Sequence, residues 1–382
     1  MDYYFDPRGG TEQQVLQLVQ FMDKSRYEPS LTLLRASEYI ERNGFPCPVM
    51  VLGISKIANI RSIITLLRFG FELRRQGYRI VHCFFNDVSL IAPPVFRMFG
   101  IRVLVSRRDM GFWYTTRLLM VLRVVSQFVD CYVVNSQAVK RIVQEQEHVD
   151  AKTISVIYNG YVTTARATND TELTKRLGSA DGGPIIGIVA NLRQIKRIDT
   201  LIKAFGAICT RFHDARLVIV GDCQSEQAKS VLEGLENLAI DLGVHNRVIF
   251  TGSVDDALPY VNRFAVAVLC SESEGFSNAL MEYMQAGRPI ICTDTGGNPE
   301  LIQDGTNGYL VPVGDVDALA GRLVKLLSDS ALARRLGEAA RETVRSTYSH
   351  TRMLAEQMAC YDQVLSGTRS DLQFKRASGI VR

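Results

Sequence analysis

Two glutamates eight positions apart, Glu274 and Glu282, flank a glycine-containing loop and the start of a predicted helix. The apolar run 264–269 before them predicts a buried strand, and Ser277 is a suitable N-cap for the helix. Backbone N–H groups at the start of such a helix point towards a space that suits a phosphate or another anion. Carboxylates beside an anion site are better suited to accepting hydrogen bonds from hydroxyls. The segment therefore predicts a site for a phosphorylated sugar.

Short apolar, β-branched runs alternate with helical patterns along the whole chain. Buried strands that alternate with helices indicate parallel sheets covered on both faces. Two sets of runs predict an α/β chain with two Rossmann-like, doubly wound domains, at 1–162 and 163–366, followed by a tail at 367–382. The division follows Asn159-Gly160, a turn signal. The predicted strands are 31–34, 49–52, 80–85, 103–106, 132–135 and 154–158 in the first domain, and 185–190, 217–220, 248–251, 266–270, 289–293 and 308–311 in the second.

The start of the chain departs from this pattern. Gly9-Gly10 predicts a turn that leads into a helix over 12–22, and in a doubly wound domain a buried strand should precede that turn. Only Tyr3-Tyr4-Phe5 is available, which is short and lies among polar residues. We therefore expect the first strand to be stunted or missing.

The composition is ordinary for a globular chain: 382 residues, 47% hydrophobic and 22% charged. No apolar stretch reaches the roughly 18–20 residues that span a bilayer, and the first six residues lack the apolar segment of a secretory signal. Eight cysteines are scattered without a Cys-x-x-Cys pair, which is typical of thiols in a reducing cytosol. We expect a cytoplasmic protein, with the option of peripheral contact with the cytoplasmic membrane face.

The charge is distributed unevenly. Residues 1–160 hold 20 Lys and Arg against 14 Asp and Glu, whereas the rest of the chain holds 24 against 26. The first half is therefore basic and the second half slightly acidic. Two helical patterns in this half, 57–75 and 112–123, interleave apolar residues with arginines. Such helices can dock on an anionic membrane, where a lipid-linked acceptor would be found. The alternative is that both helices face the core and their arginines are solvated. We expect no nucleic-acid partner.

An ordered series of short segments resembles family 4 of the retaining glycosyltransferases. The most specific segment is Glu274-x7-Glu282 within 271–282. The others cover nearly the whole chain in the family's order. They are Gly9-Gly10-x-Glu12, Asn135-Ser136 and Tyr158-Asn159-Gly160 in the first half, and 189–192 with Lys196, 220–222, 250–252, 295–302 and 304–308 in the second.

The resemblance implies the GT-B fold, with the donor nucleotide sugar held mainly by the second domain and the acceptor by the first. It implies a hexosyltransferase that moves a sugar from a nucleotide diphosphate to a glycan or lipid-linked hydroxyl, with retention of anomeric configuration. It implies no catalytic metal and no other cofactor, and Asp255-Asp256 lacks the spacing of an Asp-x-Asp metal site. A nucleotide-sugar epimerase and a catalytically silent binding protein are the alternatives on the same fold.

The resemblance also assigns roles in the second domain. Glu274 matches the catalytic-site glutamate beside the donor sugar, Glu282 matches the glutamate that accepts hydrogen bonds from the ribose, and Lys196 matches the phosphate-binding lysine. The family usually has an arginine at the position of Asn191, so Arg193 is a candidate to supply the missing charge. The remaining donor-binding candidates are Gly252, Gly275, Phe276, Ser277 and Asn278.

The first domain matches the family less completely. Gly10 belongs to a loop that matches the glycine loop of the family, which approaches the diphosphate of the donor. The alternative is that this loop is a simple turn. Many members have a histidine after the strand at 103–106, and this chain has none there. Asp109 is the candidate to orient the acceptor hydroxyl or donor sugar, unless it pairs with Arg107 or Arg108. His82 lies within a predicted strand, which favours a structural role.

Overall fold

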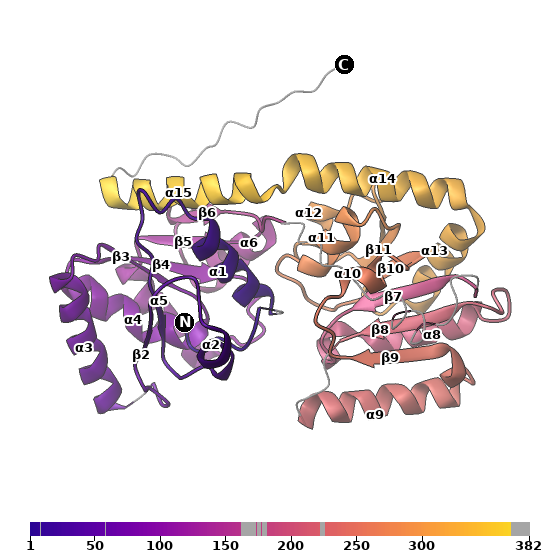
Figure 1. Ribbon diagram of the computed structural model, residues 1–382, viewed down its shortest axis with the longest axis horizontal. Coiled ribbons are helices and arrows are strands. Elements are labelled where there is room, and N and C mark those ends of the chain that lie inside the picture. The colour runs from indigo at the N-terminus through magenta and orange to yellow at the C-terminus, as the bar shows by residue number, and fades with distance from the viewer. Residues whose placement is uncertain are drawn as a thin grey trace, which may run out of the picture. The chain divides into compact units, whose positions relative to one another are not determined.

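The computed structural model describes residues 1–7, 9–57, 59–161, 173, 177, 182–221 and 226–367. The chain divides into two compact units (Figure 1). Unit 1 comprises Met1–Tyr158 together with the chain from Met353, and unit 2 comprises Asn159–Arg352. Both units are built on parallel strands joined by helices, so the predicted α/β class is confirmed.

Unit 1 contains two parallel sheets. A two-stranded sheet joins β1 to β2, and a four-stranded sheet has the order β3-β4-β5-β6. The described residues 1–7 form no strand, as expected. The strands are β1 (Leu31–Leu33), β2 (Val49–Val51), β3 (Ile80–Cys83), β4 (Arg102–Arg107), β5 (Cys131–Val134) and β6 (Ile154–Val156).

The first residues of the chain contact both sheets of unit 1. The N–H of Leu34, just after β1, donates to the Met1 carbonyl over 3.0 Å. The Asp2 carboxylate accepts hydrogen bonds of 2.9 and 2.7 Å from the N–H groups of Asp87 and Val88, at the start of α4 (Asn86–Met98). The segment therefore lies between β1 and the loop after β3, and Asp2 satisfies helix N–H groups that lack an intrahelical acceptor.

Alternating side chains of the four-stranded sheet build two cores. Val103 and Tyr132 contribute to one core, and Leu104 and Val133 to the other. This division follows from the period of two in a strand. Helices α3 (Ile60–Arg75), α4 and α6 (Gln137–Gln146) contribute to the first core, and α1 (Gly10–Phe21) and α15 (His350–Ser366) to the second. Unit 1 also contains α2 (Glu38–Asn43) and α5 (Thr116–Val125).

The last helix differs from the predicted domain division. We assigned 163–366 to the second domain, whereas the part of α15 from Met353 belongs to unit 1, and the division earlier in the chain falls after Tyr158. Met358 and Tyr361 are buried in the same core as Leu104. The apolar face of α15 carries no signal of which sheet it covers. The predicted tail, 367–382, lies outside the described residues except for Gly367.

Unit 2 is built on one parallel sheet with the strand order β12-β11-β10-β7-β8-β9. The chain runs outward in one direction from β7 to β9 and in the other from β10 to β12, and β7 pairs directly with β10. In open parallel sheets, ligands bind outside the carboxyl ends of the strands at such a reversal. The strands are β7 (Ile185–Val189), β8 (Arg216–Val220), β9 (Val248–Gly252), β10 (Val266–Leu269), β11 (Ile290–Thr293) and β12 (Tyr309–Val311).

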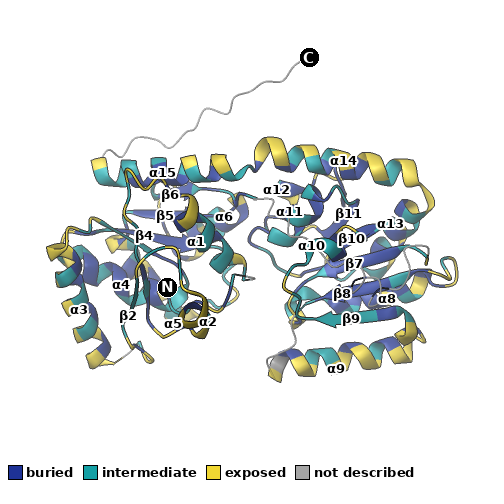
Figure 2. Cartoon of the chain, in the orientation of Figure 1, coloured by how far each residue is buried: buried dark blue, intermediate teal, exposed yellow. Residues whose placement is uncertain are grey.

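The sheet of unit 2 is buried on its central strands, which Figure 2 shows in dark blue. Helices α8 (Ile198–Ile208), α9 (Glu226–Asp241) and α13 (Val316–Ser328) contribute to the core on one face. Helices α10 (Leu258–Val261) and α11 (Asn278–Gln285) contact strands β7 and β10, and α14 (Ser330–Thr347) packs against α11. Residues Asn298–Leu301 form the short helix α12.

All predicted strands are present, with ends within two residues of the prediction. The seven cysteines in the described ranges are free thiols, and all but Cys47 are buried; Cys223 lies outside those ranges. No helix in the described part of the chain combines the length and apolarity that crossing a bilayer requires.

Candidate functional site

The loops after β7 and β10 meet where the strand order reverses. Lys196, the last residue of the short 3₁₀ helix η3 (Gln194–Lys196), places its Nζ 2.7 Å from Glu274 Oε1. The two side chains are only 22% and 11% exposed. The Glu272 N–H donates to the Ile195 carbonyl over 2.8 Å, which ties the two loops together. The fold thus brings two sequence-predicted site residues into direct contact.

The backbone of Glu274 is held by the turn after β11. Gly296 has a left-handed φ of 53°, and a Cβ there would lie 1.8 Å from the Glu274 carbonyl oxygen. The N–H of Gly297 donates to that oxygen over 3.1 Å, and Thr295 Oγ1 donates to the Glu272 carbonyl over 2.9 Å. Glycine at 296 is therefore required by both its backbone angle and its close approach to the loop.

The start of α11 carries the candidates that follow Glu274. Gly275, Phe276 and Ser277 are buried, and Ser277 Oγ accepts a 3.3 Å hydrogen bond from the Leu280 N–H as the helix N-cap. Asn278 Oδ1 accepts a 2.7 Å hydrogen bond from Asn159 Nδ2. The N–H groups of a first helical turn have no acceptor within their own helix. This end of α11 is therefore suited to an anion.

Glu282 lies just over one turn further along α11. Burial, together with a smaller contribution from the negative charge of Asp256, raises the pKa of Glu282 to about 7. Burial also raises the pKa of the Tyr161 hydroxyl, with contributions from Glu282 and Asp256. These three groups form a second cluster in unit 2. Of these three groups the sequence predicts Glu282 alone, because the motif that contains Glu282 includes neither Asp256 nor Tyr161.

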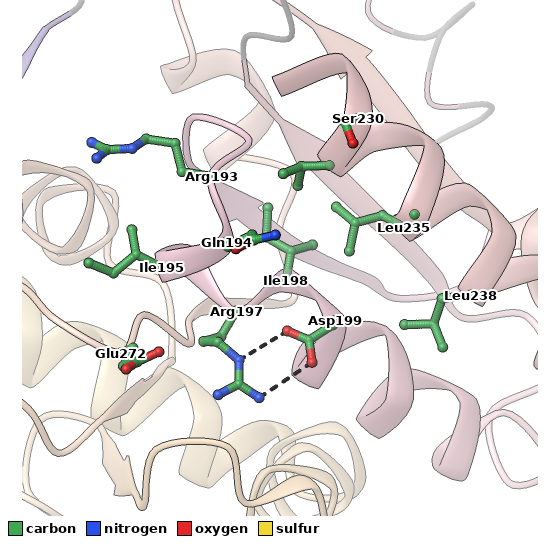
Figure 3. Close-up of a pocket in the computed structure, with 12 residues that line it drawn as sticks. Arg193, Gln194, Ile195, Arg197, Ile198, Asp199, Ser230, Leu235, Leu238 and Glu272 are labelled. Carbon is green, nitrogen blue, oxygen red and sulfur yellow. Dashed lines mark hydrogen bonds and ion pairs between the residues drawn. The ribbon is translucent and has the colours of Figure 1, made fainter. Parts of the chain in front are cut away.

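The two candidates between β7 and η3 are exposed. The Asn191 carbonyl accepts a 2.9 Å hydrogen bond from the Arg193 N–H. Arg193 lines a groove of about 670 Å³ between η3 and α9, and Figure 3 shows its side chain extending away from Leu235 and Leu238. Lys196, by contrast, contacts Glu274 directly. The role of Arg193 stays a prediction.

The residue after Lys196 has an unusual backbone. Arg197 has a left-handed φ of 48°, and the Cys270 thiol donates to the carbonyls of Lys196 and Arg197 over 3.2 and 3.1 Å. The Arg197 guanidinium pairs with Asp199, with Nε 3.1 Å from Oδ1 (Figure 3). A left-handed arginine has no sequence signature, so this turn was not predicted.

Gly252 ends β9 with a left-handed φ of 67°. Its carbonyl accepts hydrogen bonds of 3.3 Å from the Gly221 N–H and 3.0 Å from Thr251 Oγ1. A Cβ on Gly221 would lie 1.8 Å from the Ala190 carbonyl oxygen. The carboxyl ends of β7, β8 and β9 therefore approach one another closely through glycine.

Gly10 and Asp109 lie in unit 1. Gly10 begins α1, and the preceding Gly9 leaves space for Glu12, because a Cβ on Gly9 would lie 2.3 Å from Glu12 Oε2. Asp109 Oδ1 accepts hydrogen bonds of 2.8 Å from the Gly111 N–H and 3.0 Å from Trp113 Nε1. Burial raises the pKa of Asp109, although these two bonds act against that shift. Asp109 therefore organises its own loop.

Of the two arginines considered as partners of Asp109, Arg107 pairs instead with Glu147. Arg107 makes a two-pronged ion pair with Glu147, of 2.6 and 3.1 Å, and donates to Ser89 Oγ over 2.9 Å. Both charged side chains are buried. A buried guanidinium needs such a partner, and Glu147 lies 40 residues away in the sequence, beyond any local pattern.

His82 has a structural environment. Its Nδ1 lies 2.9 Å from the Tyr361 hydroxyl and its Nε2 2.9 Å from Ser106 Oγ. Burial lowers its pKa to about 3, so the ring is neutral near pH 7. Within the described ranges, no group of three or more His, Cys, Asp or Glu side chains is placed to hold a metal ion.

Two family descriptions together cover most of the chain. Glycosyltransferase Family 4 matches residues 8–165, and Glycosyl transferases group 1 matches residues 169–343. The N-acetyl-alpha-D-glucosaminyl L-malate synthase of Bacillus anthracis is 34% identical over 215 residues, which cover 56% of this chain and 55% of that protein. A phosphatidyl-myo-inositol mannosyltransferase of Mycobacterium leprae is 33% identical over 172 residues, 44% of this chain and 43% of that protein. The chain spans about half the length of the curated relatives it matches.

Solved structures extend the likeness to the fold. A glycosyltransferase from Rickettsia africae superposes with a TM-score of 0.83 at 19% identity and covers 95% of this chain and 97% of that one. Anabaena HepE, in complex with UDP, superposes with a TM-score of 0.81 at 18% identity, over 95% of this chain and 100% of that one. The chain therefore belongs to the glycosyltransferases of group 1 and family 4, and its fold is GT-B.

Proposed function

We propose that the protein transfers a hexose-type sugar from a nucleotide diphosphate to a hydroxyl of a glycan or lipid-linked acceptor, with retention of anomeric configuration. The observation that carries this proposal is the contact between Lys196 and Glu274, at 2.7 Å, where the strand order of unit 2 reverses. HepE has been solved with UDP and with UDP-glucose, so UDP-hexoses are the first donors to test. The proposal requires no metal and no other cofactor.

The proposed reaction exchanges one bond at the anomeric carbon. The acceptor oxygen forms a bond to that carbon, the bond to the β-phosphate oxygen breaks, and the acceptor proton leaves with the nucleoside diphosphate. Negative charge grows on the leaving diphosphate, so a cation and N–H dipoles that are already in place lower the barrier. Lys196 and the first turn of α11 supply them in this proposal.

The two glutamates have different tasks in the proposal. Glu274 accepts hydrogen bonds from sugar hydroxyls and stabilises positive charge at the anomeric carbon. Glu282, when ionised, accepts hydrogen bonds from the ribose hydroxyls. Asp109 orients the acceptor indirectly, through the loop that it holds by its bonds to Gly111 and Trp113. We place the reaction in the cytoplasm or at the cytoplasmic face of a membrane.

The test is nucleotide release with defined UDP-hexoses, with and without glycan and lipid-linked acceptors. Acceptor-dependent release of UDP supports transfer, whereas interconversion of the sugar or binding without turnover contradicts it. NMR of the product distinguishes retention from inversion. Glu274→Gln should abolish release, and Glu272→Gln is the matched control, because Glu272 is exposed and contacts the loop through its backbone. Equal activity of both variants would show that Glu274 is not the catalytic carboxylate.

A further inference from the structure

Helix α3 of unit 1 exposes an apolar stripe. Ile60 and Phe71 are 67% and 61% exposed, and Ile64 lies between them on the same side of the helix. The spacing of four and seven residues keeps the three side chains on one helical face. The opposite face, with Leu66 and Leu73, is buried in the core. Helix α3 therefore carries apolar residues on two opposite faces, one buried in the core and one exposed to solvent (Figure 2).

Helix α5 has the same arrangement. Met120, Val121 and Val124 are exposed on one side, and Val124 is 59% exposed. Leu122 and Val125 are buried on the other side. An amphipathic helix normally turns polar residues to water once its apolar stripe is buried. Exposed apolar residues on two neighbouring helices are typical of a surface that contacts a membrane or another protein.

The charge of these helices identifies the partner. Helix α3 carries four arginines and one glutamate, and α5 carries two arginines and no acidic residue. Arg61 and Arg68 are exposed beside the α3 stripe, and neither makes an ion pair with any residue in the described ranges. By contrast, α9 of unit 2 has four acidic residues and one lysine. Apolar residues flanked by arginines are the pattern of helices that lie in the interface of anionic lipids.

We propose that the outward residues of α3 and α5, with their arginines, form a docking surface for an anionic lipid bilayer. Helix α4 packs against both helices, and the Phe71 ring lies 6.5 Å from the ring of Phe99 at the end of α4. A connection follows β2 before α3 begins and another follows β4 before α5 begins, and the second of these contains both Asp109 and the exposed Phe112. The inference that this surface holds a lipid-linked acceptor rests on the proposed function, whereas the prediction that it binds vesicles does not.

The first measurement is co-sedimentation of the full chain with vesicles of phosphatidylcholine alone or with added phosphatidylglycerol. Binding is expected only with the anionic lipid, and it should weaken as salt screens the arginines. Trp113, the only tryptophan in the chain, precedes α5 and gives a local readout. Brominated phospholipids should quench its fluorescence if this surface contacts the bilayer.

Three exposed-site variants decide between the possible occupants. Arg61→Gln/Arg68→Gln should lower the partition coefficient roughly 25-fold, at about fivefold for each arginine. Ile64→Gln/Phe71→Gln should lower it by at least about tenfold. Ile240→Gln, on a 56% exposed residue of the acidic helix α9, should bind like the parent.

The proposal is overturned if no anionic-lipid binding is seen, or if Ile240→Gln loses as much binding as the other variants. It is also overturned if light scattering shows a dimer that Ile64→Gln/Phe71→Gln disperses, because a second copy would then cover the surface. Circular dichroism and thermal melting check that each variant is folded. If Ile64→Gln/Phe71→Gln loses vesicle binding but releases UDP in detergent as fast as the parent, the docking surface is separate from the catalytic site.

Discussion

Glu282→Gln should alter how the stability of the protein depends on pH. In the native protein the pKa of Glu282 is raised to about 7, mainly by burial and also by Asp256. The ordinary glutamate pKa is 4.5. Between these two values the native carboxyl keeps its proton while the unfolded chain has lost it. The native state therefore binds more protons than the unfolded state, and the free energy of unfolding falls as pH rises through this window.

The size of the effect follows from the shift. One pKa unit corresponds to about 1.4 kcal/mol, so the shift lowers stability by at most about 3 kcal/mol between pH 4.5 and pH 7. The side chain keeps some contact with water, which makes this figure an upper bound. Above pH 7 the carboxyl is ionised in both states and the loss stays constant. Glutamine does not titrate, so the variant should lack this slope.

The assay compares urea unfolding of the parent and Glu282→Gln from pH 4 to pH 8.5. The difference in unfolding free energy between the parent and Glu282→Gln should change between pH 4.5 and about 7 and then stay constant. Asp256→Asn should shift the change to lower pH, because it removes the charge that opposes ionisation of Glu282. If Glu282 binds ribose as a carboxylate, UDP affinity should rise as pH passes through about 7. A pH-independent difference between parent and variant would refute the reasoning.

Three further substitutions test other parts of the structure. Glu147→Gln should cost about 3–5 kcal/mol in urea unfolding, because it leaves the buried Arg107 without its counter-charge; a cost below about 1 kcal/mol would contradict this. Gly296→Ala should inactivate the protein and lower its melting temperature, because the new Cβ would meet the Glu274 carbonyl at 1.8 Å; unchanged activity would show that the loop can move. Lys196→Ala should weaken UDP binding about tenfold or more by calorimetry, through loss of a charge-assisted hydrogen bond to phosphate; unchanged affinity would remove Lys196 from the donor site.

The strands were predictable because their signal is local. Runs such as 131–134 and 266–269 are continuously apolar, as strands buried on both faces must be. The sequence pattern predicts a helix over 91–99, whereas α4 begins earlier, at Asn86. Its first N–H groups are satisfied by the carboxylate of Asp2, more than 80 residues away in the sequence. A cap supplied from that distance leaves no mark in the local sequence.

The site was predictable where it depends on neighbours in sequence and not where it depends on the fold. The placement of Glu274 in the loop before α11 and of Glu282 within that helix follows from the local sequence. The cluster of Glu282 with Asp256 and Tyr161 does not, because these residues come from three separate segments of unit 2. Asp109 and Trp113 are near neighbours in sequence, but their hydrogen bond depends on the conformation of the loop that contains both, which the sequence does not predict. Pairings across loops need the tertiary structure.

The contact between Lys196 and Glu274 explains why the two residues should respond differently to substitution. Without a donor, each satisfies the charge of the other over 2.7 Å in a partly buried place. A diphosphate competes with Glu274 for Lys196, and it is repelled by the same carboxylate. Removing the lysine therefore removes an attraction to the donor, whereas neutralising the glutamate removes a repulsion together with the group that stabilises the anomeric carbon. Affinity for UDP and rate of transfer should consequently fall together in Lys196→Ala but separate in Glu274→Gln, where binding is kept and transfer is lost.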